Sequence, residues 1–320
     1  MKRTTIWAVL VGMCVVPVAV QAADASGYEA VVGLSYATES SILPNTADYD
    51  WWYGCSATSA GMAMGYYDRN GYAGLSYSNL VAGGVAEAST HGGVMGTWEY
   101  LAQYAIASPG HAADFYSGGY EASGDDNYTG RAFDCLADFM GTSQDACGNS
   151  NGGTTFYYYT DGLVLTSDTL DYLATLGYDY YDSDGMYGIG EYVEYCGYSV
   201  AQLYTQATNN VSGAEILGFS FEDYMAEIDA GRVVLLHVEG HTMIGVGYGD
   251  NNLVYLYETW YKGLDSMIWG GKFSGMEMWG VTVLELAGGD AMVPVPGAIL
   301  LAGLGAGCVR WLRRRGSLLS

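Results

Sequence analysis

The sequence has very little positive charge for its length. It carries 11 lysine and arginine residues against 35 aspartate and glutamate residues, for a formal net charge of −24 at pH 7. All the acidic residues lie between Asp24 and Asp290, and that stretch holds only a few basic ones, namely Arg69, Arg131, Arg232, Lys262 and Lys272. A surface this acidic repels nucleic acid and anionic membranes, so we expect neither as a partner of this stretch.

Long apolar runs are missing from the body of the chain, and the two short ones lie at its ends. Met1–Arg3 is basic, Ile6–Val20 is apolar, and Val20-Gln21-Ala22 fits the small-residue cleavage rule. This order predicts a secretory signal peptide over residues 1–22. Near the other end, the run from Gly297 to Val309 is short for a bilayer span. The arginines after it predict a cytoplasmic end, with the body outside.

The C-terminal segment, residues 291–320, has three features in a fixed order: Val293-Pro294-Val295-Pro296, a glycine-rich apolar run, and a cluster of arginines. In this order they resemble the PEP-CTERM sorting tail of exported bacterial proteins. The resemblance implies transient anchoring in the inner membrane and removal of the tail by a sorting protease of the exosortase type. It also implies a location in the envelope of a Gram-negative-type bacterium. An ordinary tail anchor is the alternative.

Cysteine and histidine are scarce, which narrows the choice of catalytic side chains. Cys14 and Cys308 lie in the terminal apolar segments, so the body contains only Cys55, Cys135, Cys147 and Cys196. An exported protein is expected to form a disulfide, and Cys135–Cys147 is the favoured pair because the two are close in sequence and flank a short loop. That pairing leaves Cys55 and Cys196 unpaired.

An aromatic run, Trp51-Trp52-Tyr53, stops at Gly54-Cys55 and is followed by small residues and methionines. With Gly71 as a stop signal, the pattern predicts a helix over 55–70 with Cys55 in its first turn. The free N–H groups of a helix start favour a thiolate, which is the nucleophilic form of cysteine. The alternative is that Cys55 is a small buried residue or half of a disulfide.

A base for such a nucleophile is available in His241. The apolar segment 233–238 and the alternating segment after His241 both read as strands, joined by a tight turn at Glu239-Gly240. A further strand, 253–260, ends near Glu258, whose carboxylate can orient the imidazole. Taken alone, His241 also fits a hydrogen-bonded core histidine and Glu258 a solvated strand end.

Together these segments resemble the bacteriocin-leader-type (family-39-like) cysteine peptidases, a branch of the papain superfamily. The segment around Cys55 is similar to the family's nucleophile helix, Gly240-His241-Thr242 to its histidine strand, and Tyr257-Glu258-Thr259-Trp260 to its acid-bearing strand end. The resemblance implies a Cys55–His241–Glu258 triad, a peptide or protein substrate, and no cofactor. Its oxyanion region falls on Asp50 and the N–H of Cys55. Where the family has a glutamine, this chain has Tyr49.

The fold class expected is α+β and papain-like over residues 23–290. A helical front half carries the cysteine, and an antiparallel β-rich back half carries the histidine. No metal site is expected. Asp182–Glu191 follows a calcium loop only in part, because Tyr180 would take the first ligand position. The turn at Glu239-Gly240 also separates His237 from His241. The rival to a peptidase is an envelope surface or binding protein that kept this fold without catalysis.

Overall fold

The computed structural model describes residues 6–11, 40–81, 101–111, 132–144, 147–178, 180–208 and 218–288 of the 320-residue chain. Its helices are α1 (Cys55–Asn70), α2 (Leu101–Ile106), α4 (Leu136–Phe139), α5 (Ser167–Thr175), α6 (Gly185–Tyr195) and α7 (Phe221–Asp229), with a short 3₁₀ turn, η3, at Tyr181–Ser183. The first half of the described chain is mainly helical and the second mainly strand, which confirms the α+β class.

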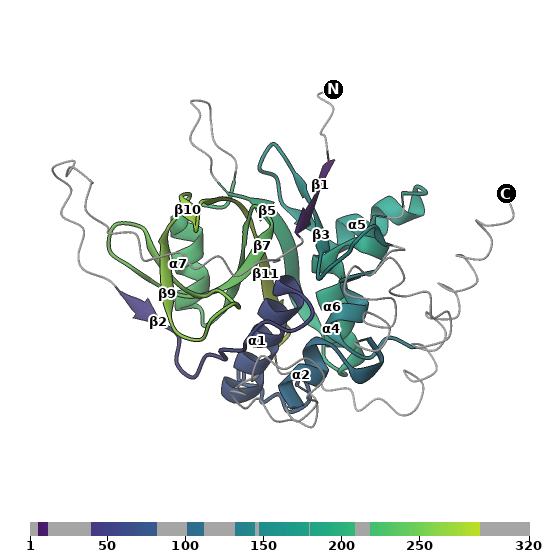
Figure 1. The fold of residues 1–320 in the computed structure, drawn as a ribbon, viewed down its shortest axis with the longest axis horizontal. Coiled ribbons are helices and arrows are strands. Elements are labelled where there is room, and N and C mark those ends of the chain that lie inside the picture. Colours follow the sequence, from purple (N-terminus) through teal and green to yellow (C-terminus); the bar gives the residue numbers. More distant parts are fainter. Residues whose placement is uncertain are drawn as a thin grey trace, which may run out of the picture.

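Helix α1 spans the range that the sequence predicts, and it lies at the centre of the molecule (Figure 1). Nearly all of its residues are buried, and a helix that is apolar or small all round fits such a position. Gly61 packs against Ile106 of α2, and Gly65 packs against Tyr49, at contacts too close for a β-carbon. At the far end Gly71, with φ 70°, takes a conformation that glycine favours and that ends the helix.

The strands are β1 (Ile6–Val11), β2 (Ser41–Ile42), β3 (Thr154–Tyr159), β4 (Leu165–Thr166), β5 (Val200–Ala207), β6 (Val234–Val238), β7 (His241–Gly249), β8 (Leu253–Tyr257), β9 (Asp265–Ile268), β10 (Lys272–Phe273) and β11 (Met276–Leu286). Within the described residues the main sheet has nine strands. Seven of them follow the order β4-β5-β11-β6-β7-β8-β9, while β2 pairs with β7 and β10 pairs with β11. All of these pairings are antiparallel.

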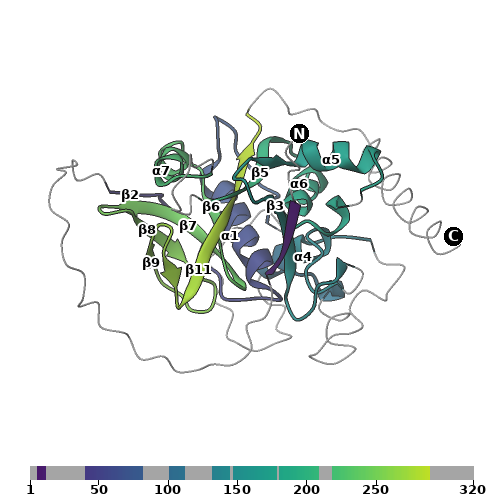
Figure 2. The ribbon, with the colours of Figure 1, turned by 90° about the horizontal axis from the view of Figure 1, so that it is seen from above.

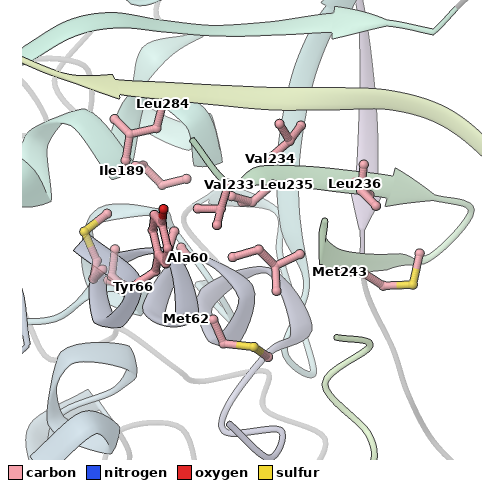
Figure 3. Packing of buried hydrophobic residues seen from close by; sticks show 14 of the residues in the cluster. Ala60, Met62, Tyr66, Ile189, Val233, Val234, Leu235, Leu236, Met243 and Leu284 are labelled. Atoms are coloured by element: carbon pink, nitrogen blue, oxygen red, sulfur yellow. The ribbon is translucent and has the colours of Figure 1, made fainter. Parts of the chain in front are cut away.

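The core lies between α1 and the middle of this sheet (Figures 2 and 3). Ala60, Met62 and Tyr66 of α1 lie beside the strand β6 and its neighbours, and every residue of β6 and β7 is buried. The hydroxyl groups of Ser56 and Ser59 on α1 form hydrogen bonds with Thr242 at the start of β7. The hydroxyl of Tyr224 on α7 donates to the carbonyl of Gly247 in the second half of β7. Strand β7, with the candidate histidine at its first position, is therefore held by both helices.

Some local predictions were wrong. We expected residues 154–159 and 162–166 to pair as a hairpin around Thr160-Asp161, but β3 pairs with β1 and β4 pairs with β5. The helix expected at 132–140 is confined to α4, because Cys135 is extended. The helix expected at 97–107 appears as α2 within the described part, whereas the strand expected at 29–34 lies outside it.

The structure describes part of the N-terminal apolar segment and none of the predicted C-terminal tail. Residues 6–11, within the predicted signal peptide, form β1, which pairs with β3 in a small sheet separate from the main one. Residues 291–320, the predicted sorting tail, lie outside the described residues. Within the ranges that the structure does describe, none of the helices has the length and apolar character needed to cross a membrane.

Candidate active site

Cys55 is the first residue of α1, and the backbone before it adopts unusual angles. Tyr53 has φ 56° and Gly54 has φ 147°. A β-carbon on Gly54 would lie 2.7 Å from Cγ2 of Thr142 and 2.8 Å from the carbonyl oxygen of Gly152, so only glycine fits. The hydroxyl of Thr58 accepts from the N–H of Trp52 at 2.9 Å and donates to the carbonyl of Gly54 at 2.7 Å. These bonds fix the direction in which Cys55 enters the helix.

The polar groups next to Cys55 favour its thiolate. The main-chain N–H of Thr242, the hydroxyl and N–H of Ser56, and the N–H of Cys55 itself all lower the pKa of the thiol, as expected near a helix start. Burial has the larger and opposite effect, because only 2% of Cys55 is exposed, and the net result is a raised thiol pKa. The groups at the helix start therefore favour the thiolate, but burial outweighs them.

His241 is the first residue of β7 and is fully buried. Its Nε2 lies 2.6 Å from the main-chain oxygen of Glu258. A carbonyl oxygen can only accept, so in the neutral ring Nε2 carries the proton and Nδ1 carries the lone pair. The indole of Trp260 stacks on the imidazole with ring centres 4.0 Å apart. Burial lowers the pKa of His241 to about 4, so the ring is neutral at neutral pH.

Glu258 contacts His241 through its main-chain carbonyl oxygen. The sequence had predicted that the side-chain carboxylate of Glu258 would make this contact. Its Oε1 accepts from the N–H of Tyr261 at 2.6 Å, and the N–H of Trp260 also donates to the carboxylate. Burial raises the pKa of Glu258 to about 7. Thr259, with φ 76°, turns the chain between the carbonyl that holds the imidazole and the N–H groups that hold the carboxylate. The group that orients the imidazole is thus a main-chain carbonyl. Every residue type has this group, so the identity of residue 258 does not predict its role.

Among the described residues of the predicted oxyanion region, the candidate hydrogen-bond donors are main-chain N–H groups. Tyr49, in the glutamine position, is buried with its hydroxyl against Gly65, about 15 Å along α1 from Cys55. The carboxylate of Asp48 accepts from the N–H of Gly263 at 2.9 Å. Asp50 is half-buried in the extended stretch before α1. The N–H groups of the first turn of α1 remain the candidates for stabilising an oxyanion.

Three residues that sequence reasoning did not assign lie around the thiol and the imidazole: Ser56, Thr242 and Trp260. Ser56 and Thr242 directly follow Cys55 and His241, and their hydroxyl oxygens are 2.9 Å apart. Their adjacency to the two predicted catalytic residues is a signal that the sequence does contain. The stacking of Trp260 on His241 is a long-range contact, and no local pattern indicates it.

The described residues contain one group whose atoms could hold a metal ion. His111, Cys135 and Asp138 are fully buried, with their potential ligand atoms within 4.8 Å of one another. Nδ1 of His111 lies 2.9 Å from Oδ1 of Asp138. Oδ2 of Asp138 accepts from the N–H of Asp134, and the N–H groups of Ser108 and Asp138 lower the pKa of the Cys135 thiol. Through the His111–Asp138 contact the group links α4 to the segment after α2.

Asp184, in the partial calcium loop, and Cys147, in the expected disulfide, both have hydrogen-bond partners in the protein. Asp184 caps α6, and its carboxylate accepts from the N–H groups of Tyr157 and Tyr187 at 2.7 and 2.8 Å, so the acidic stretch there is a helix start. The disulfide expected between Cys135 and Cys147 is not formed; Cys147 donates to Gln144 at 3.6 Å instead. Cys55 is also unpaired as a disulfide.

Comparison with known proteins returned no match: no family model, no curated protein and no solved structure is similar enough to this chain to count.

Proposed function

We propose that this protein is an exported cysteine peptidase in which Cys55 is the nucleophile and His241 the general base. The observation that carries the proposal is the meeting of the α1 start with the β7 start. The hydroxyl oxygens of Ser56 and Thr242, the residues after Cys55 and His241, lie 2.9 Å apart. The Glu258 carbonyl holds the imidazole in the tautomer whose Nδ1 is basic.

The chemistry follows the order that a thiol–imidazole pair allows. Nδ1 of His241 takes the thiol proton as the Cys55 sulfur bonds to the peptide carbonyl carbon. The resulting oxyanion accepts from N–H groups of the first turn of α1. As the C–N bond breaks, the departing amine takes the proton from His241 and leaves a thioester. Water, deprotonated by the same imidazole, then releases the acid and restores the thiol.

The resting site is closed, so substrate binding has to expose the thiol. Cys55 is 2% exposed and His241 is fully buried, with Trp260 stacked over the imidazole. In this proposal, the 258–262 turn moves when a peptide binds. Removing the indole from the imidazole would raise the pKa of His241, and admitting polar groups to the thiol would lower the pKa of Cys55, because burial causes both shifts.

A non-catalytic surface or binding protein with the same fold is the second candidate. The same burial of Cys55 favours it, as does the direction of Tyr49, whose hydroxyl lies against Gly65 and supplies no donor near the sulfur. In that case the thiol and imidazole serve only as packed core groups.

An active-site titration separates the two candidates. The exported protein is treated at reduced pH with a peptidyl electrophile that reacts with thiols, and the labelled peptide is identified by mass spectrometry. We expect labelling at Cys55 that is lost in Cys55→Ala and strongly slowed in His241→Ala. Labelling elsewhere, or equal labelling of Cys55 in His241→Ala, would favour the non-catalytic protein.

We also propose that the mature protein begins after Ala22 and loses its tail after about Pro296. The support is the order of charge, apolar run and small residues at one end, and of the proline motif, apolar run and arginines at the other. Mass spectrometry of the envelope or secreted product tests both ends. A mature product that still contains residues 313–320 would identify the tail as a retained anchor.

A further inference from the structure

Three buried side chains outside the candidate active site are of the types that bind transition metals. His111 is the last residue of the described segment 101–111, Cys135 directly precedes α4, and Asp138 is the third residue of α4. One potential ligand atom of each lies within 4.8 Å of those of the other two, and all three residues are 0% exposed. An imidazole nitrogen, a thiolate sulfur and a carboxylate oxygen are the three kinds of protein ligand that zinc takes.

Hydrogen bonds to neighbouring groups hold two of these residues in place. The main-chain N–H of His111 donates to the hydroxyl of Ser108 at 3.2 Å. Oδ2 of Asp138 accepts from the N–H of Asp134 at 3.1 Å, and Nε2 of Gln144 donates to the main-chain oxygen of Asp138 at 2.8 Å. Ligands that are already ordered lose little conformational entropy when an ion binds.

The distances within the group are close to those of a tetrahedral ion. Nδ1 of His111 lies 2.9 Å from Oδ1 of Asp138. Metal–ligand bonds of about 2.0–2.3 Å place neighbouring ligand atoms of tetrahedral zinc about 3.3–3.6 Å apart. The nitrogen and oxygen therefore have to separate by about 0.4 Å, and the Cys135 sulfur has to approach them by about 1.3 Å or less. Rotations of the side-chain torsions supply shifts of this size.

The charge of the group selects a divalent ion. As ligands, the imidazole of His111 is neutral, while the thiolate of Cys135 and the carboxylate of Asp138 carry one negative charge each. A divalent cation neutralises the sum. Without a cation, burial and then the charge of Asp138 raise the pKa of the Cys135 thiol well above its usual value, so the thiol keeps its proton. Binding of the ion releases this proton to the solvent, and the imidazole proton is on Nε2 when Nδ1 holds the ion.

We propose that Nδ1 of His111, Sγ of Cys135 and Oδ1 of Asp138 form a binding site for one zinc-like divalent ion. Water completes the coordination in zinc sites that have three protein ligands. The sequence did not indicate this site, because His111 lies 27 residues before Asp138. The ring of His111 meets that of Tyr53 edge to face, with centres 6.2 Å apart, so the ion stabilises the backbone that leads into Cys55 and α1. The site goes beyond the proposed peptidase function and does not depend on it.

The first test uses Co²⁺, which takes the same ligands as zinc and gives a sulfur-to-metal charge-transfer band in the near ultraviolet when it binds a thiolate. The purified, reduced protein is freed of metal with a chelator and titrated with Co²⁺. We expect the band to saturate at one equivalent in the wild type and to be absent in Cys135→Ser. Asp138→Asn, which keeps the size but loses the charge, should weaken binding about tenfold or more. Ions on the acidic surface give no such band, because they bind oxygen.

Cys147→Ser is the matched control. The sulfur of Cys147 lies 3.6 Å from Oε1 of Gln144, and a serine hydroxyl can make the same hydrogen bond. Since this sulfur is not part of the group, we expect the band at wild-type intensity. No band in the wild type, a band that persists in Cys135→Ser, or equal loss in Cys147→Ser would overturn the site.

The second test needs no substitution in the group. X-ray absorption at the zinc edge, with one equivalent of zinc bound to the wild type, should show one sulfur at about 2.3 Å and nitrogen or oxygen ligands at about 2.0–2.1 Å. The same spectrum is expected of Cys55→Ala. A shell of nitrogen and oxygen alone, or loss of the sulfur in Cys55→Ala, would overturn the proposal. This test decides the question even if Cys135→Ser fails to fold, and neither test measures peptide cleavage, so both stay readable if the protein is no peptidase.

Discussion

At the scale of single residues, burial has the strongest effect on the candidate site. It raises the pKa of the Cys55 thiol and lowers the pKa of His241 to about 4, so the two shifts act together against the thiolate–imidazolium pair. The N–H groups at the helix start lower the pKa of Cys55, and the bond that His241 donates to the Glu258 carbonyl raises the pKa of His241, but both effects are smaller than that of burial. Reactivity should therefore respond to whatever uncovers these two side chains.

Removing the indole over the imidazole tests this directly. In Trp260→Ala we expect the pKa of His241 to rise toward 6.5, measured by NMR titration, because the stacked ring keeps water away. Iodoacetamide should also label Cys55 faster, by about tenfold for each unit by which the thiol pKa falls. Tyr261→Ala is the control, since that side chain is 69% exposed and should have no effect. An unchanged His241 in Trp260→Ala would contradict the account.

The buried carboxyl of Glu258 gives a pH prediction with a defined sign. Its pKa is raised from 4.5 to about 7, so the folded state holds the proton more tightly than the unfolded state does. Its contribution to stability is fully present below pH 4.5 and is lost as the pH rises to about 7. We expect the unfolding free energy of the wild type, relative to Glu258→Gln, to fall across that window in urea titrations. A rise would contradict the burial.

The candidate pair was chosen from the sequence, but the groups that contact it depend on the fold. Few histidines were available, and Cys55 stood between an aromatic run and a helical pattern, so Cys55 and His241 could be chosen from residue types. The acceptor for His241 is a main-chain carbonyl, and any residue at position 258 presents one. His237 was visible only as one member of an alternating pair, and its partners Thr242 and Thr282 come from two other strands.

At the scale of elements, the start of α1 depends on Gly54. The Gly54→Ala variant combines a positive φ with contacts of 2.7 and 2.8 Å to Thr142 and Gly152. We expect it to lose at least about 3 kcal/mol of unfolding free energy, or to fail to fold. Gly74→Ala is the matched control, because Gly74 also has positive φ but open space around it, and should cost about 1 kcal/mol. Equal losses in urea denaturation would show that the contacts at Gly54 do not matter.

The elements also show where local sequence information ends. Helix α1 was predicted with both boundaries, because Gly-Cys at one end and Gly71 at the other are local signals. The capping box of α7, in which Ser220 and Asp223 bond each other's backbone, is equally local. Strand β3 was predicted with its bounds, whereas β4 covers only Leu165–Thr166 of the strand expected at 162–166. Both were paired wrongly, because a strand's partner is decided by burial across the sheet and not by the turn nearest to it.

At the scale of the whole molecule, the small β1–β3 sheet offers a test of the predicted export. β1 lies in residues that a signal peptidase would remove, and its pairing is with β3, apart from the main sheet. The protein beginning at residue 23 should therefore fold and unfold in a single transition, followed by circular dichroism. A form that stays unfolded without residues 1–22 would make β1 part of the domain and not of a signal peptide.

The most direct measurement of the central claim is cleavage of a peptide library by the purified protein, with products identified by mass spectrometry. The account predicts peptide-bond cleavage by the wild type, its loss in Cys55→Ala and in His241→Ala, and its retention in Glu258→Gln, because the Glu258 main-chain carbonyl and not the carboxylate holds the imidazole. Cleavage that survives in Cys55→Ala, or a wild type that cleaves no peptide, would contradict the claim that Cys55 and His241 form a peptidase site.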